Sequence, residues 1–245
     1  MSVKVYTVDI ETTPLLVRTW SMWKPTIQAS NIIEDRRILC IAWKEVGAKS
    51  ARSSRVGAGK TEREMIAEFR AAIDDADILV GHNLDGFDMK HVTAKLIEYD
   101  LPPFQKLHTI DTLKEVRRVA KFSSNRLDFL CGKLLGSAKH DTDMQLWIDC
   151  MAGDEKALDR MERYCRNDVV ITEALYLKLR PYFRNHPNIA PSGSMACPRC
   201  ASEAATVRKA YRTKAGVERA HVHCLACSAP YTISPKGPNR PHSAV

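Results

Sequence analysis

Hydrophobic and polar positions alternate in two patterns through the first three quarters of the chain. Runs of apolar and β-branched residues, typical of strands, alternate with segments whose apolar residues recur at helical spacing. Thr61 and Glu64 form a capping box at the start of one such segment. The pattern predicts strands at 3–10, 37–46, 51–56, 78–81 and 108–111, and helices at 61–73, 87–99, 112–120, 126–135 and 154–183, the last as one helix or a helix pair.

Strands interleaved with helices, followed by helices gathered at the end, indicate an α/β layered sheet. We assign this domain to residues 1–185. The segment 185–196 is rich in Pro, Gly, Ser and Asn, and residues 186–196 are predicted to form a linker. A small cysteine-containing module follows at 197–234, and the Pro-containing tail at 235–245 is predicted to be disordered.

Composition narrows the class of protein. The chain has 245 residues, 44% hydrophobic and 27% charged, which excludes a wholly disordered protein. It has no apolar run of the ~18–20 residues that cross a membrane. The amino-terminal residues enter a strand pattern directly and show no signal peptide. We therefore expect a reducing, cytoplasmic environment.

Charge is concentrated towards the carboxyl end. The net charge is +8, yet residues 1–185 hold 29 basic and 27 acidic residues, a net of +2. Residues 186–245 hold 8 basic and 2 acidic residues, a net of +6. A basic terminal module indicates a polyanionic partner, most often nucleic acid, although a merely soluble surface would show the same excess.

Three short acidic motifs carry the candidate chemistry. Asp9 and Glu11 lie two apart on the first predicted strand, so their side chains share a face and need a counter-charge, most simply a divalent cation. Asp88 ends an N-x-x-x-F-D motif between a strand and a helix, where a simple helix cap is the alternative. Tyr164 and Asp168 are four apart and share one face of the last helix.

The order of these motifs resembles the DEDD exonuclease superfamily. Tyr164 makes the chain similar to the DEDDy branch and to the proofreading domains of family B DNA polymerases. The segment 18–23 resembles stand-alone, phage-type members, which implies a bacterial or phage-infected cell. The resemblance covers roughly residues 3–183. It implies a ribonuclease H-like fold, a mixed sheet flanked by helices.

The family removes nucleotides from 3′ ends with two divalent metals, Mg²⁺ or Mn²⁺, which all-oxygen ligands select. The resemblance implies that Asp9 ligates both ions. Glu11 and Asp168 complete the water-activating site, and Asp88 holds the second ion. Tyr164 orients the nucleophilic water. We therefore predict a 3′–5′ exonuclease, acting on DNA more than RNA.

Substrate-contacting residues are less distinct in the sequence. Asn83 either pins its loop or touches the terminal nucleotide. The loop containing Lys121, Asn125 and Arg126 combines cations and polar groups suited to a single-stranded backbone. Asp111 either caps the helix at 112–120 or supports the metal site. Two tryptophans, Trp20 and Trp23, either stack on bases or pack as a core or lid.

Four cysteines of the terminal module form two C-x-x-C pairs: Cys197, Cys200, Cys224 and Cys227. In a reducing compartment this spacing predicts a zinc ribbon with one structural Zn²⁺, rather than disulfides. Iron or redox use is the alternative. Basic residues between the pairs, among them Arg208, Lys209 and Arg212, are predicted to contact phosphates, or else the ribbon binds protein.

Two other functions remain open for the α/β domain. One is a structure-specific endonuclease, because ribonuclease H-like folds also carry such enzymes. The other is a non-catalytic nucleic-acid-binding module, although all five site residues are present.

Overall fold

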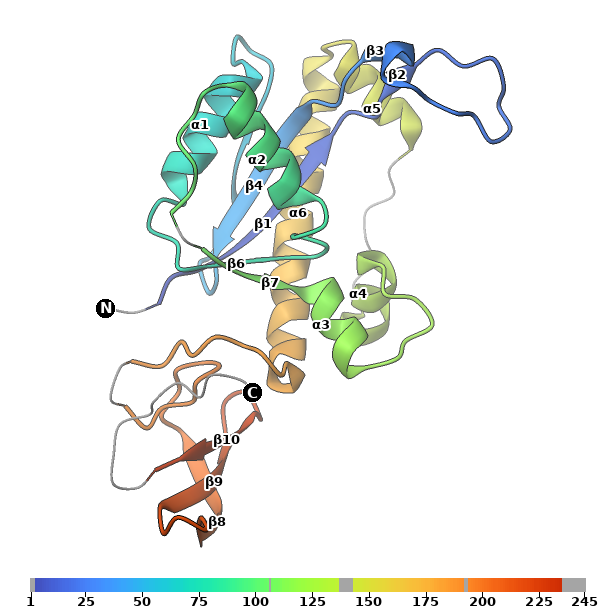
Figure 1. Cartoon of the computed structure of the whole chain (residues 1–245). Helices are drawn as coiled ribbons and strands as arrows, with labels where there is room; N and C mark the ends of the chain where they lie inside the picture. Colours follow the sequence, from blue (N-terminus) through green and yellow to red (C-terminus); the bar gives the residue numbers. More distant parts are fainter. Residues whose placement is uncertain (1–2, 106, 137–142, 192–193, 235–245) are drawn as a thin grey trace.

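A five-stranded mixed sheet forms the centre of the larger part of the molecule, in the order β5-β4-β1-β6-β7 (Figure 1). Strand β1 (Val5–Thr12) is antiparallel to β4 (Ile38–Glu45) and parallel to β6 (Ile78–Gly81). The outer strands are β5 (Arg52–Arg55), antiparallel to β4, and β7 (His108–Asp111), parallel to β6. The computed structural model describes residues 3–105, 107–136, 143–191 and 194–234.

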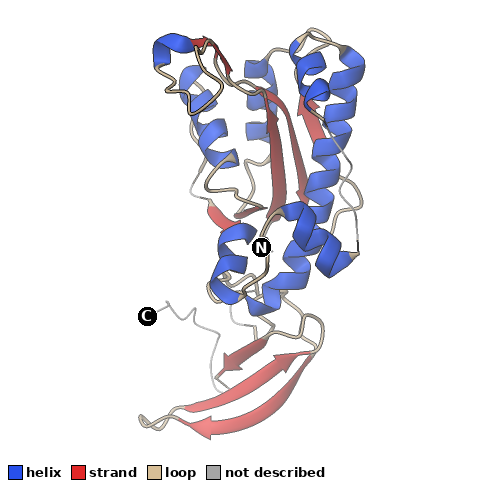
Figure 2. Cartoon of the chain, turned by 90° about the vertical axis from the view of Figure 1, so that its right-hand side faces the viewer, coloured by secondary structure: helices blue, strands red, loops and turns tan. Residues whose placement is uncertain are grey.

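Helices cover both faces of this sheet (Figure 2). On one face lie α1 (Glu62–Ala72) and α2 (Asp88–Glu98), whose buried residues share a core with β1 and β4. On the other lies α6 (Glu155–Leu179), 25 residues long and continuous, so a single helix and not a helix pair occupies this stretch. The expected mixed sheet between helices is confirmed.

Alternation along β1 sorts its side chains between these two cores. Tyr6, Val8 and Ile10 are buried against α1 and α2. Val5 packs in the cluster that includes α6. Because successive side chains of a strand point to opposite faces, Asp9 and Glu11 face α6.

Several elements escaped the prediction. A short hairpin, β2 (Leu16–Val17) with β3 (Ile32–Glu34), follows β1, with a 3₁₀ turn, η1 (Ala29–Asn31), ahead of β3. Its strands are too short to give a periodic signal. Helix α5 (Met144–Met151) was also missed, although Asp143 caps its start by accepting a hydrogen bond from Leu146 N. The predicted helices α3 and α4 are present as Thr112–Val119 and Leu127–Leu135.

A second, three-stranded antiparallel sheet lies within the predicted module at 197–234. It consists of β8 (Ala205–Arg212), β9 (Glu218–Cys224) and β10 (Pro230–Ile233), with β9 in the middle. Ala220, Val222 and Ile233 form its small core. The predicted disordered tail at 235–245 lies outside the described residues.

The second sheet is joined to the end of α6 (Figure 1). A 3₁₀ turn, η2 (Arg180–Tyr182), ends the helix, and the Arg199 guanidinium donates a hydrogen bond to the Pro181 carbonyl. In the predicted linker, Ile189 N donates to Pro198 O at 2.8 Å, and Ile189 packs against the core that includes α6. Among the described residues, no helix combines the length and apolar character of a membrane span.

Candidate active site and cysteine cluster

Three of the predicted carboxylates converge where β1 passes α6. One oxygen each from Asp9, Glu11 and Asp168 lies within 4.8 Å of the other two. Asp168 is 2% exposed, whereas Asp9 and Glu11 are half-buried. The Cys165 thiol lies 3.4 Å from the Asp9 carbonyl and 3.6 Å from its carboxylate. Burial, together with the neighbouring Cys40, raises the pKa of Cys165, so the thiol stays protonated and can donate.

This arrangement suits a divalent cation. Oxygens on opposite sides of a bound Mg²⁺ or Ca²⁺ are roughly 4 to 5 Å apart, which is comparable with the 4.8 Å spread of the three carboxylates. Three carboxylates so close repel one another unless a cation or protons compensate them. The donor set contains only oxygen, which favours hard ions such as Mg²⁺ and Mn²⁺.

Asp88 is held next to this group but is not a member of it. It is the first residue of α2, is 5% exposed, and accepts a hydrogen bond from Ile10 N at 3.1 Å. Strand β6 pairs with β1 only at positions 5–7, so this backbone N–H is left for Asp88. Burial raises the pKa of Asp88 to about 7, and the charge of Asp111 adds to that rise.

Tyr164 lies one turn before Asp168 on α6 and is buried. Its ring makes an edge-on contact with Trp147 of α5, with centroids 6.5 Å apart. The Trp147 indole N–H in turn donates to Thr12 O at 3.1 Å, at the end of β1. Sequence reasoning missed Trp147, because the signal for α5 was limited to the Asp143 cap and the spacing of its few apolar residues.

A cavity of about 470 Å³ connects these elements. Three of the lining residues are neighbours of the motifs: Thr12 follows Glu11, Phe87 precedes Asp88, and Trp147 contacts Tyr164. The lining residues are Thr12, Thr13, Pro14, Arg36, Phe87, Asp143, Met144 and Trp147. The cavity therefore lies beside the candidate site, although its lining includes neither the four predicted metal ligands nor Tyr164.

Asp111 caps α3, which is one of the two roles that the sequence left open. Its carboxylate caps α3 by accepting from Leu113 N and Lys114 N at 3.0 and 3.3 Å. It also accepts from Asn83 N at 3.0 Å and Asp85 N at 3.3 Å, which fixes the loop before Asp88. Asn83 itself is exposed and has a left-handed backbone with φ of 69°.

His82 joins that loop to the predicted strand-gripping loop. Its Nδ1 lies 2.9 Å from the Thr112 hydroxyl and its Nε2 2.8 Å from Asn125 O. The structure thus places the Asn83 loop beside Asn125, while Lys121 and Arg126 are exposed on the same segment.

The other predicted substrate contacts lie on the second sheet. Arg208, Lys209 and Arg212 are all exposed on β8, and Arg212 pairs with Glu218 at 3.1 Å. Lys209 is the cross-strand partner of His221, and Arg208 and His221 both line a hollow of about 280 Å³.

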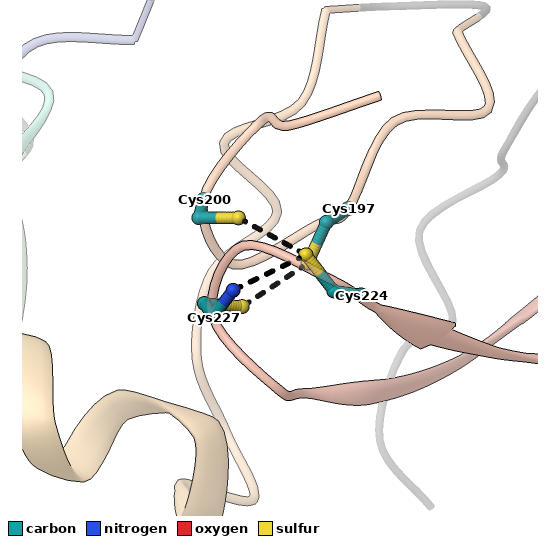
Figure 3. A group of neighbouring side chains, drawn as sticks. All are labelled: Cys197, Cys200, Cys224 and Cys227. Atoms are coloured by element: carbon teal, nitrogen blue, oxygen red, sulfur yellow. Dashed lines mark hydrogen bonds between the residues drawn. The ribbon is translucent and has the colours of Figure 1, made fainter. Parts of the chain in front are cut away.

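The four predicted cysteine ligands point toward one another (Figure 3). The Sγ atoms of Cys197 and Cys227 are 3.7 Å apart, and those of Cys200 and Cys224 are 3.5 Å apart. Four sulfurs around zinc with Zn–S bonds of about 2.3 Å would be about 3.8 Å from one another, so the cluster is close to that geometry. Burial raises the pKa of Cys197 to about 11, whereas backbone N–H groups outweigh burial and lower that of Cys224 to about 7.

Two DNA polymerases are similar to this chain, one in sequence and one in fold. The chain is 23% identical over 194 residues to the DNA polymerase delta catalytic subunit of Dictyostelium discoideum, covering 63% of this chain and 18% of that protein. Its fold is similar to that of the family B DNA polymerase from Pyrobaculum calidifontis. The TM-score is 0.54 at 17% identity, over 73% of this chain and 25% of that one. The chain thus spans about a quarter or less of the length of either polymerase.

A family model described as the RNase H superfamily matches residues 34–180. The match runs from the strand beside β1 to the end of α6 and includes Asp88, Tyr164 and Asp168. It spans more than half of the 245 residues. The chain therefore belongs to the RNase H superfamily.

Proposed function

We propose that this chain is a metal-dependent 3′–5′ exonuclease of the DEDDy type. The observation that carries the proposal is the convergence of Asp9, Glu11 and Asp168 within 4.8 Å, with Tyr164 one helical turn from Asp168. Similarity to two DNA polymerases supports DNA as the substrate more than RNA.

Each carboxylate has a separate role in this proposal. Asp9, Glu11 and Asp168 would hold one divalent cation. Asp88 would hold a second together with Asp9, because its hydrogen bond from Ile10 N fixes it beside the residue that follows Asp9. When bound, the cations would lower the pKa of a bound water and neutralise charge on the phosphate.

Tyr164 orients the attacking water. A phenol has an unperturbed pKa near 10 and is a weak base at neutral pH, so its role is to position the water by a hydrogen bond. The contact with Trp147 holds the ring of Tyr164 in place.

The cavity beside the carboxylates accommodates the terminal nucleotide. Its volume of about 470 Å³ and its aromatic lining, Phe87 and Trp147, suit a base and sugar. Asn83, Lys121, Asn125 and Arg126 are close to one another through the His82 contacts, and they bind the adjoining strand.

The cysteine cluster holds a structural zinc ion. Four sulfurs fill a tetrahedral site, so no position is left for a substrate, and the metal would stabilise a module whose own core is small. Its reduced cysteines suit the cytoplasm. Arg208 and Lys209 on β8 bind phosphates of the substrate.

End-labelled linear strands and a closed single-stranded circle test the activity. The proposal expects nucleotides to be released one by one from labelled linear DNA in Mg²⁺ or Mn²⁺, none in EDTA, and no cleavage of the circle. The Asp9→Asn variant should be inactive, while Asp74→Asn, an exposed carboxylate elsewhere, should retain activity.

Cleavage of the circle would make the chain an endonuclease. Strand binding without cleavage in any of these metals would make it a binding module. Either result would overturn the proposal.

A further inference from the structure

An arm projects from the end of β1. The Thr13 N–Arg37 O bond of 2.8 Å closes its base, and residues 14–36 form the arm, which the β2–β3 hairpin holds together. Figure 1 shows this segment in dark blue, reaching away from the central sheet. The arm is therefore a separate extension of the strand that carries Asp9 and Glu11.

Large apolar side chains at the tip of the arm are exposed to solvent. Trp20 is 104% exposed, Met22 85% and Trp23 83%. Neither tryptophan packs in a core, which excludes one of the alternatives that the sequence left open. Exposed aromatic groups gathered in one place mark an interaction surface.

Charge on the arm indicates the partner. Between Glu11 and Glu34 the sequence contains no acidic residue, whereas Arg18 and Lys24 flank the two tryptophans. Arg18, Lys24 and Trp20 line one hollow of about 350 Å³, together with the hydroxyl-bearing Thr19 and Ser21. Cations, hydroxyls and an aromatic face in one hollow match the phosphates and bases of a nucleic-acid strand.

The tip is also locally ordered. Ser21 Oγ accepts from Trp23 N at 3.1 Å and donates to Trp23 O at the same distance, and Lys24 turns the chain with φ of 46°. The two indoles are therefore held in a fixed turn, which lowers the entropy that binding would cost.

The arm is continuous with the candidate active site. Pro14 and Arg36 belong to its base, and both line the cavity that also contacts Thr12, Phe87 and Trp147. A strand whose 3′ end occupies that cavity can pass from it directly onto the arm.

We propose that the arm binds the single-stranded part of the substrate upstream of its 3′ end, with bases stacked on Trp20 and Trp23 and phosphates on Arg18 and Lys24. The inference rests on the proposed exonuclease function and extends it, because it assigns single-stranded DNA as the form of the substrate.

The test compares strand lengths in EDTA, where no cleavage occurs. Anisotropy of fluorescein-labelled oligothymidylates gives the affinity for a long strand of about twenty nucleotides and for a trinucleotide, which extends only two nucleotides beyond the cavity. In the Trp20→Ala/Trp23→Ala variant, the ratio of long-strand to trinucleotide affinity should fall at least about 30-fold, because each lost stack weakens binding roughly fivefold or more. Trp20→Phe/Trp23→Phe should restore most of it. Ile97→Ala, which removes an exposed apolar side chain from α2, should leave the ratio unchanged.

Three results would overturn the inference. One is an unchanged ratio in the alanine variant, and another is an equal loss at both lengths. The third is a change from dimer to monomer in sedimentation with unchanged strand binding, which would show that a second copy covers the arm. Failure of the proposed function is a separate outcome, since it would appear as absent hydrolysis of thymidine 5′-monophosphate p-nitrophenyl ester and of DNA by the unmodified protein.

Discussion

Replacing Asp168 by Asn should have opposite effects on stability with and without metal. Two unit charges 4.8 Å apart repel by about 3.5 kcal/mol at an effective dielectric constant of about 20. Asp168 has two such neighbours, Asp9 and Glu11, and both are half-buried, so water screens much of this repulsion. Without metal, we expect Asp168→Asn to raise the free energy of unfolding by about 1 to 3 kcal/mol.

With bound metal, the unmodified protein should gain more stability than the Asp168→Asn variant. A cation that binds only the folded protein stabilises it by an amount that grows with its concentration. Asp168→Asn removes one ligand, so Mg²⁺ or Mn²⁺ should raise the free energy of unfolding of the unmodified protein more than that of the variant. Hydrolysis by the variant should fall at least about 100-fold.

Urea unfolding at about pH 7.5, in EDTA and in Mn²⁺, measures the free energy of unfolding without and with metal. Asp74→Asn is the matched control, because Asp74 is exposed, lies outside the group of three carboxylates, and has only a surface ion pair of 3.7 Å with Arg70 to lose among the contacts described. If Asp168→Asn were no more stable than the unmodified protein in EDTA and also gained as much stability from Mn²⁺, the three carboxylates would not be a metal-binding cluster.

Three further predictions concern other parts of the molecule. Tyr164→Phe should slow hydrolysis by about 10- to 1000-fold with little change in strand affinity in EDTA, and an equal change in both would contradict a role in positioning water. Cys200→Ser, or a zinc chelator, should unfold the second sheet. Hydrogen exchange would then show that the amides of β8 and β9 lose their protection. If these amides stayed protected, a structural metal would be excluded. His186 has a pKa lowered to about 4 by burial beside Tyr176, so its unfolded form binds a proton at a higher pH than its folded form. The free energy of unfolding should therefore fall as pH drops from about 6.5 towards 4, by about 2 kcal/mol between pH 7 and 5. His186→Gln should remove this loss of stability, as measured by urea unfolding at both pH values. An unchanged pH dependence in the variant would contradict the prediction.

The fold was predicted best where one periodicity dominates. The central strands and the helix carrying Tyr164 and Asp168 follow from apolar spacing, and strand alternation was enough to place Asp9 and Glu11 on one face. The hairpin after β1 could not be found in this way, because its strands are two and three residues long. Helix α5 was missed although it is as long as α3, which was predicted. Their positions depend on tertiary contacts such as that of Trp147 with Thr12 O.

The candidate site also combines features that the sequence predicts with features that depend on tertiary contacts. Spacing placed Asp9 and Glu11 on one face of a strand, and the resemblance to the DEDD superfamily implied that Asp168 would join them. Neither indicated that Asp88 would be tethered to Ile10 N. That bond depends on where β6 stops pairing with β1, which is a property of the assembled sheet. Asp111 likewise has one role that its local sequence predicts, the cap, and one that only the folded loop creates.

Because helix α6 is continuous, it fixes the distance between the candidate active site and the cysteine module. Asp168 and Arg180 are twelve residues apart on one rigid rod, about 18 Å at 1.5 Å per residue, and the turn that anchors the cysteine module begins at Arg180. Under the proposed function, a substrate strand that contacts both the carboxylates and β8 must span at least that distance. Once the strand is shortened below that length, it loses its contacts with β8, so the reaction should leave small oligonucleotides that dissociate before they are hydrolysed.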